Sequence, residues 1–249
     1  MQARLLASNY WSASRAPRYS LLFVLPLLLL YEGLAAGLGD AGAAHVRNAA
    51  DIALKTPFML LSGARGSLAF FATIVAACVY LVGRDLLRAK EPLSPRTFGL
   101  MLAESAVLAS LLGVVVGTIT QRLLGLSVVT QSGGVALAAM GPGTRLMLAL
   151  GAGLYEELLF RVLLVGGLAA GFRWIVGRRT WMTGAMAAVI GALVFSAFHY
   201  VGEYGDTLEV ASFTYRAIAG LAFSGLYLVR GFGITAWTHA LYDIYVMVF

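Results

Sequence analysis

The chain has 249 residues, of which 60% are hydrophobic and 12% are charged. Soluble domains carry about 25% charged residues, so this composition and the mean hydropathy of +0.83 exclude an ordinary soluble protein and predict a polytopic membrane protein. The formal net charge is +6, but apolar stretches separate the basic residues too widely for a nucleic-acid-binding stripe. An excess of basic residues in inner membrane loops explains the charge better.

Apolar stretches recur along the whole chain. Because one crossing needs about 20 residues, we expect an all-α transmembrane helical bundle of about seven spans, within a range of roughly six to eight. Residues 1–249 are expected to form a single membrane domain, with N-terminal spans in 1–144 and a motif-bearing, candidate catalytic core in 145–249. The expected spans cover residues 19–39, 67–83, 97–120, 145–172, 182–202, 213–229 and 232–249.

The start of the chain is basic and then apolar, which also describes a secretory signal sequence. Glu32 inside the first span and the lack of a clear small-x-small cleavage site favour a retained anchor. Residues 40–66 are mixed in character and predict an amphipathic interfacial helix that ends near Pro57. Placing the N-terminus in the cytoplasm puts most of the loop Lys and Arg residues inside, and we therefore predict that orientation.

The stretch 151–165, GAGLYEELLFRVLLV, carries Glu156, Glu157 and Arg161 within an apolar span. Ionisable groups inside a membrane are costly and indicate function. Glu157 and Arg161 are four residues apart, so they are expected to pair on one helical face. Glu156 is rotated about 100° from Glu157 by the helical period and lacks that partner. It is therefore a candidate base or metal ligand.

Two histidines also fall in apolar spans. His199 closes the run Phe195-Ser-Ala-Phe-His199, and the i,i+4 spacing lets the Phe195 ring fix the imidazole. His239 and Asp243 are again one turn apart and can point into one cavity. Each histidine alone fits a helix-to-helix hydrogen bond equally well, but three such motifs in successive spans favour a site.

The residue types in these motifs allow two chemistries, and the sequence leaves both open. The carboxylates and imidazoles can bind a divalent metal that activates water. Alternatively, Glu156 helped by a histidine activates water directly, while His239 and Asp243 stabilise the oxyanion. The sequence has no His-Glu-x-x-His metalloprotease helix and no Gly-x-Ser-Gly of a rhomboid-type serine protease.

The segments Glu156-Glu157-Leu-Leu-Phe-Arg161, Phe195-Ser-Ala-Phe-His199 and His239-Ala-Leu-Tyr-Asp243 occur in this order. Together they resemble the CPBP family of intramembrane proteases, which includes the type II CAAX prenyl endopeptidases and bacterial Abi-type proteins linked to bacteriocin processing and self-immunity. The resemblance covers roughly residues 145–249. It implies a helical membrane fold with a conical active-site cavity in a bacterial inner membrane. It also implies an endopeptidase acting on a membrane-associated peptide or protein, with or without a lipid.

By this resemblance Glu156 is the general base with His199 beside it, and His239 and Asp243 form the oxyanion site. Supporting roles fall to Glu157, Arg161 and Phe195. The family has been described both as metal-dependent and as glutamate-type, so the cofactor stays open: the metal alternative is one zinc ion held by Glu156, His199, His239 and Asp243.

Asp243 departs from the family pattern, because the prenyl endopeptidases typically have Asn at this position. An ionised Asp repels a developing oxyanion unless it is protonated, paired with a histidine or bound to metal. Asp243 thus favours metal binding or a second acid/base role, and it argues against CAAX-type substrates. Two other classes of function remain: a non-catalytic membrane scaffold or immunity protein of the same fold, and a small proton-coupled transporter.

Overall fold

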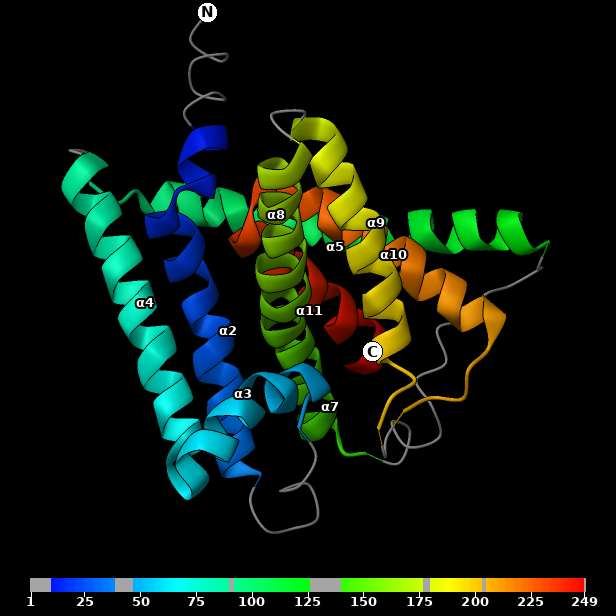
Figure 1. The fold of residues 1–249 in the computed structure, drawn as a ribbon, viewed down its shortest axis with the longest axis horizontal. Coiled ribbons are helices and arrows are strands. Elements are labelled where there is room, and N and C mark those ends of the chain that lie inside the picture. The colour runs from blue at the N-terminus through cyan, green and yellow to red at the C-terminus, as the bar shows by residue number, and fades with distance from the viewer. Residues whose placement is uncertain are drawn as a thin grey trace, which may run out of the picture.

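The computed structural model describes residues 10–38, 47–89, 92–125, 140–176, 180–202 and 205–248. Every regular element in these ranges is a helix, which confirms the all-α prediction. Residues 40–46 of the predicted interfacial segment lie outside the described residues. The helices (Figure 1) are α2 (Pro17–Gly37), α3 (Ala49–Ser62), η1 (Gly63–Arg65), α4 (Gly66–Ala89), α5 (Pro95–Leu124), α7 (Pro142–Gly151), η2 (Ala152–Val165), α8 (Gly166–Val176), α9 (Thr180–Phe198), α10 (Val210–Arg230) and α11 (Phe232–Val248).

Within the described ranges, five helical stretches are long and apolar enough to cross a bilayer: Pro17–Gly37, Ala49–Ala89, Pro95–Leu124, Pro142–Val176 and Trp181–Phe198. They include the first five predicted spans. Helices α10 and α11 form where the last two spans were predicted, but neither is among the five. Since α11 has 17 residues, its length is about 26 Å at 1.5 Å per residue, short of the ~30 Å hydrocarbon core. The predicted count of about seven spans is therefore not confirmed.

The segment predicted as an interfacial helix forms α3, but the predicted end near Pro57 is wrong. Helix α3 passes through Pro57 and ends at Ser62, followed by Gly63, whose φ of 55° is accessible to glycine. Contacts on both sides of the proline hold this part of the helix: Lys55 pairs with Asp51, and the Phe58 ring meets Phe70 of α4 edge-on. Tertiary packing thus outweighs the hydrogen bond that proline removes.

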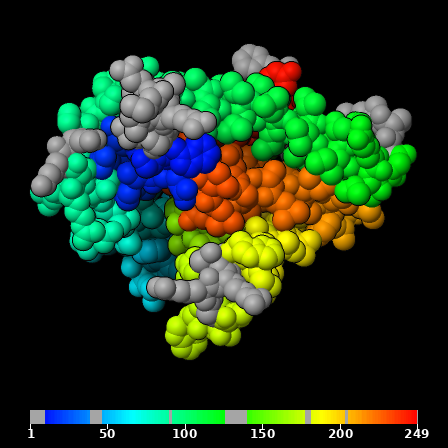
Figure 2. All heavy atoms as spheres, turned by 90° about the horizontal axis from the view of Figure 1, so that it is seen from above, coloured from blue at the N-terminus to red at the C-terminus, as the bar shows by residue number. Residues whose placement is uncertain are grey.

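Helix α11 lies at the centre of the packing, because it contacts α2, α5, α7, η2 and α10. Figure 1 shows α5 running across α2 and α4 rather than alongside them. Viewed from the end where α2 begins, the start of α2 lies against the junction of α10 and α11, with α5 along one side (Figure 2). There, the Trp237 Nε1–H donates to the Phe23 carbonyl oxygen at 2.6 Å. The N-terminal helices and the motif-bearing helices are therefore packed together.

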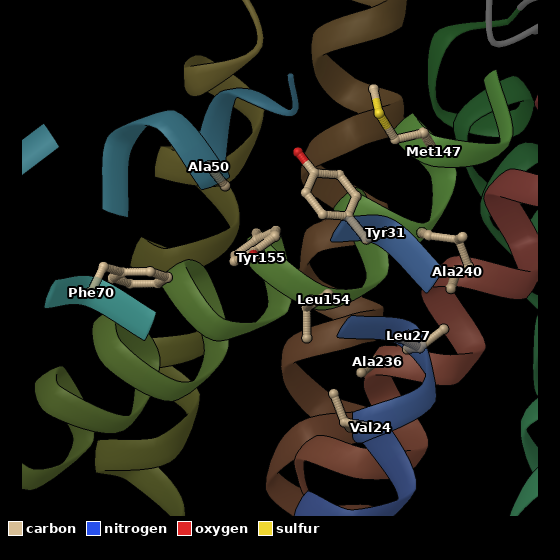
Figure 3. Packing of buried hydrophobic residues seen from close by; sticks show 11 residues of the cluster. Val24, Leu27, Tyr31, Ala50, Phe70, Met147, Leu154, Tyr155, Ala236 and Ala240 are labelled. Carbon is tan, nitrogen blue, oxygen red and sulfur yellow. The ribbon is translucent and has the colours of Figure 1, made fainter. Parts of the chain in front are cut away.

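The largest apolar cluster joins six helices around η2 and α11 (Figure 3). The side chains on α11 in this cluster, Ala236 and Ala240, are small. Opposite them lies Gly153, where an added Cβ would come 2.5 Å from the Ala236 carbonyl oxygen and 2.6 Å from the Ala240 nitrogen. Glycine at this position is therefore what lets η2 and α11 approach each other so closely.

We expect Gly153→Ala to destabilise the protein by about 1–3 kcal/mol, because the added methyl group meets backbone atoms that cannot move aside. Gly167→Ala is the matched control, since a Cβ there meets nothing within 4 Å and alanine favours the helix. Thermal unfolding in mild detergent measures both. Equal midpoints for the two variants would show that η2 and α11 are not in close contact.

Candidate active site

The first motif lies in η2, which is a π-helix rather than the α-helix expected from the sequence. Its end shows the wider turn directly, because the Gly166 N–H bonds to the Arg161 carbonyl oxygen five residues back. Such helices are rare and are found frequently at functional sites. The wider turn changes the angular spacing of its side chains, so the rotation assumed for Glu156 and Glu157 does not apply. Both carboxylates are buried, Glu157 completely.

Glu157 is held by two partners, the Arg161 guanidinium and the His239 imidazole. Its Oε1 lies 3.2 Å from Arg161 Nη1, so the predicted ion pair is present, and both side chains are completely buried. The same oxygen lies 2.7 Å from Nδ1 of His239 on α11. The contact with His239 does not follow from the sequence, because it joins residues 82 positions apart.

The buried charge of Arg161 is stabilised by aromatic rings as well as by Glu157. Its guanidinium carbon lies 4.3 Å from the centre of the Phe195 ring and 5.3 Å from that of Phe223. None of its guanidinium nitrogens makes a well-oriented hydrogen bond within the described part of the chain. A cation over desolvated rings gains about 2 kcal/mol or more, so Phe195 and Phe223 help to keep this charge in the interior.

His199 lies just beyond the end of α9, whereas the sequence predicted a span through residue 202. The helix ends at Phe198, and the chain then tightens into turns: the His199 carbonyl oxygen accepts the Asp206 N–H at 2.9 Å. The Nδ1 atom lies 2.9 Å from the Phe195 carbonyl oxygen. As only a protonated Nδ1 can donate there, Nε2 carries the lone pair. The Phe195 ring meets the imidazole edge-on at 4.9 Å, as its spacing predicted.

His239 lies between two carboxylates. Its Nδ1 faces Glu157, and its Nε2 lies 3.5 Å from Oδ2 of Asp243, one turn along α11. The Phe223 ring stacks on the imidazole, with 4.3 Å between the ring centres. The ring plane and both nitrogen positions are thereby fixed. Asp243 is thus near a histidine, one of the three conditions under which a carboxylate is tolerated at this position.

Glu156 has a partner that the sequence did not reveal. The amide Nδ2–H of Asn48 donates to Glu156 Oε1 at 2.8 Å, although the two residues are 108 positions apart. Asn48 directly precedes α3, and asparagine before a helix predicts an N-cap, but this signal does not point to Glu156. His199, His239 and Asp243 all interact electrostatically with the Glu156 carboxylate. The four candidate catalytic residues therefore lie near one another, with Glu156, His239 and Asp243 buried and His199 half-buried.

The remaining intramembrane acids are engaged elsewhere. Glu32 accepts from Tyr155 at 2.6 Å and from Lys55 at 3.1 Å. Glu104 binds the Arg230 guanidinium through both carboxylate oxygens, at 2.6 and 2.7 Å. Both acids are thus engaged in ion pairs between helices, which is a structural role.

The metal alternative can be tested against the donor geometry. Zinc sites use at least three protein ligands, and among the described side chains no three His, Cys, Asp or Glu groups come together in that way. Both ring nitrogens of His239 face carboxylates instead. The arrangement does not fit a zinc site, and the metal-ligand assignment stays a prediction.

The expected conical cavity around the motifs is not confirmed. A groove of about 380 Å³ does lie between α5 and α10, lined mostly by apolar side chains such as Leu108, Leu112 and Leu226. It includes none of the four candidate residues.

Residues 139–245 match the family model described as Type II CAAX prenyl endopeptidase Rce1-like. No curated protein and no solved structure matches the chain. The family match covers all three motifs and confirms the resemblance: this part of the chain is a domain of the CPBP family of intramembrane proteases. Its apolar helices make the protein an integral membrane protein, and the match of this part of the chain to a protease family implies a peptide substrate.

We expect Glu157→Gln to destabilise the protein by about 3–5 kcal/mol, because it leaves the Arg161 charge buried without its counter-charge. The double variant Glu157→Gln/Arg161→Met removes both charges and is expected to be less destabilised than the sum of its single changes. Chemical unfolding in detergent measures the series, with exposed Glu209→Gln as the control. Strict additivity would contradict the pairing of Glu157 with Arg161.

Proposed function

We propose that the protein is an intramembrane endopeptidase in which Glu156 activates the water that attacks a peptide bond. The observation that supports this most strongly is the burial of the Glu156 carboxylate beside two imidazoles. A carboxylate with one oxygen left for water can act as a general base, and a neighbouring histidine can help to move the proton. We further propose a bacterial inner-membrane location with the N-terminus in the cytoplasm, and one membrane domain whose catalytic core is 145–249.

In the proposed reaction Glu156 takes a proton from water as the water oxygen bonds to the carbonyl carbon. One Glu156 oxygen is held by Asn48, so the other is available for the water. His199, whose Nε2 carries the lone pair in its Nδ1-bonded form, helps to orient that water. The proton then passes to the leaving nitrogen as the carbon–nitrogen bond breaks, giving a carboxylate and an amine.

The oxyanion of the tetrahedral intermediate needs a hydrogen-bond donor, and His239 is the proposed one. With Nδ1 directed at Glu157, its Nε2 edge faces Asp243 and the substrate. In its protonated form this imidazole donates from Nε2 to the oxyanion. Asp243 then orients the ring and balances its charge rather than facing the oxyanion alone. Glu157, Arg161 and Phe195 pack around His239 and keep its ring in place.

We expect Glu156→Gln and His199→Ala to abolish cleavage while the protein stays folded. Gln keeps the hydrogen-bonding size of Glu but cannot take a proton. The measurement uses purified protein in proteoliposomes with quenched fluorescent peptides: a farnesylated CAAX peptide and an unmodified membrane-spanning peptide. Full activity of either variant would refute the assignment.

Asp243→Asn provides a graded comparison in the same assay. Its amide keeps the shape and can donate to the oxyanion, so at least part of the activity is expected to remain. A loss as complete as that of Glu156→Gln would instead give Asp243 a proton-transfer role. If wild-type protein cleaves neither peptide nor any in a wider set of membrane peptides, the non-catalytic scaffold becomes the better hypothesis.

A further inference from the structure

Asn48 makes two contacts that use opposite ends of its side-chain amide. Its Oδ1 accepts the Ala50 N–H at 2.9 Å, which caps α3, and its Nδ2–H donates to Glu156 Oε1 at 2.8 Å. Because the amide has one accepting end and one donating end, the two contacts together fix its orientation. Asn48 is 7% exposed, so water competes little for either contact. It also lies outside residues 139–245, which match the family.

The backbone of Asn48 is held by a buried polar network. Its N–H donates to Tyr31 Oη at 3.3 Å, and Tyr31 in turn donates to Asp51 Oδ2 at 2.9 Å. Asp51 pairs with Lys55 at 2.6 Å and with Arg47 at 3.1 Å. The start of α3 is therefore fastened to α2 beside the residue that contacts Glu156.

The same network reaches η2 through a second tyrosine. Tyr155, next to Glu156 in the chain, donates to Glu32, which also pairs with Lys55 and Arg47. Figure 3 shows Tyr31 and Tyr155 close together between α2 and η2, and their rings meet edge-on at 5.1 Å. Burial disfavours the charged form of Arg47, but the hydrogen bond that Arg47 donates to Asp51 and the nearby carboxylates outweigh this and raise its pKa.

The charges of this network balance, with two acids, Glu32 and Asp51, against two bases, Arg47 and Lys55. Asp51 and Lys55 are buried. Buried ion pairs contribute little net stability compared with apolar packing. Stability alone is therefore a weak reason for this network, and fixing the geometry of a neighbouring group is a better one.

Gly151, the last residue of α7, leaves room for the contact between Asn48 and Glu156. An added Cβ at Gly151 would lie 2.5 Å from Cε2 of Tyr31 and 3.0 Å from Cβ of Asn48. Any larger residue at this position would push α2 and the start of α3 away from Glu156. The absence of a side chain at Gly151 and the amide contact of Asn48 thus independently indicate that the start of α3 packs against the site.

We propose that Asn48 is a positioning residue that holds the Glu156 carboxylate in the orientation needed to activate water, with α3 as its support. This deepens the proposed function, on which it rests. Asn48 uses Oε1 and leaves the second oxygen for the nucleophile. The ionisable groups that act on Glu156 come from η2, the end of α9 and α11: Arg161, His199, His239 and Asp243. Asn48, at the start of α3, donates a hydrogen bond to Glu156 without carrying a charge.

Two variants separate capping from positioning. Asn48→Ser keeps an N-cap oxygen for α3 but has no amide to reach Glu156, whereas Asn48→Ala loses both. We expect kcat to fall about 10- to 100-fold in both variants with KM changed less than about twofold, because the base is misplaced. The melting temperature is expected to fall more for Asn48→Ala, which also loses the helix cap, than for Asn48→Ser. The positioning role would be overturned if Asn48→Ser kept the wild-type kcat and if activity fell only where the melting temperature fell.

A second experiment tests the contact without any activity. Asn48→Asp places a carboxylate against Glu156 and is expected to lower the melting temperature. In the Glu156→Gln background the amide of the introduced Gln can donate to the carboxylate of the introduced Asp. Asn48→Asp is therefore expected to lower the melting temperature less in this background. Equal shifts in both backgrounds would overturn the proposal whatever the activity. A fully active Glu156→Gln would instead refute the proposed function, while coupling in this cycle would still report the contact.

Discussion

The buried carboxylate of Glu157 is the constraint on which the site depends. A completely buried charge is tolerated only when it is paired, and here Arg161 on η2 and His239 on α11 share one oxygen. These contacts require η2 and α11 to lie close together, which Gly153 permits. They also fix the imidazole that the proposed reaction uses. In the proposed reaction the motif Glu-Glu-x-x-x-Arg therefore has two separate tasks: Glu157 and Arg161 build the support, and Glu156 is left for chemistry.

Much of this arrangement could be predicted because it is local. The all-helical fold follows from the apolar stretches, and the pairs Glu157–Arg161, Phe195–His199 and His239–Asp243 follow from i,i+4 spacing. The predictions that were wrong concern features that depend on how the chain packs and turns. Helix α3 continues through Pro57 because it is packed against α4, and α9 stops before His199 because the chain turns there. The π-helical turn of η2 and the contact of Asn48 with Glu156 have no short-range sequence signal.

The N-terminal helices do more than surround the motif-bearing region. Asn48 and the network behind it supply a donor to Glu156 from residues outside the family match. The family motifs thus describe the reacting groups, whereas part of their orientation comes from a segment that the motifs do not include. In the proposed reaction Asp243 has a supporting role, because it lies beside His239, at a position where the prenyl endopeptidases that the motifs resemble typically have Asn.

Direct attack of water on the peptide bond, which the proposed role of Glu156 requires, is tested most directly by one turnover of wild-type protein in ¹⁸O-labelled water. The protein is mixed in proteoliposomes with a membrane-spanning peptide, quenched in acid and examined by mass spectrometry of both peptide and intact protein. The proposed reaction predicts one ¹⁸O atom in the new carboxyl group and no mass added to the protein. A covalent peptide–protein adduct, or no cleavage of any membrane peptide, would contradict it.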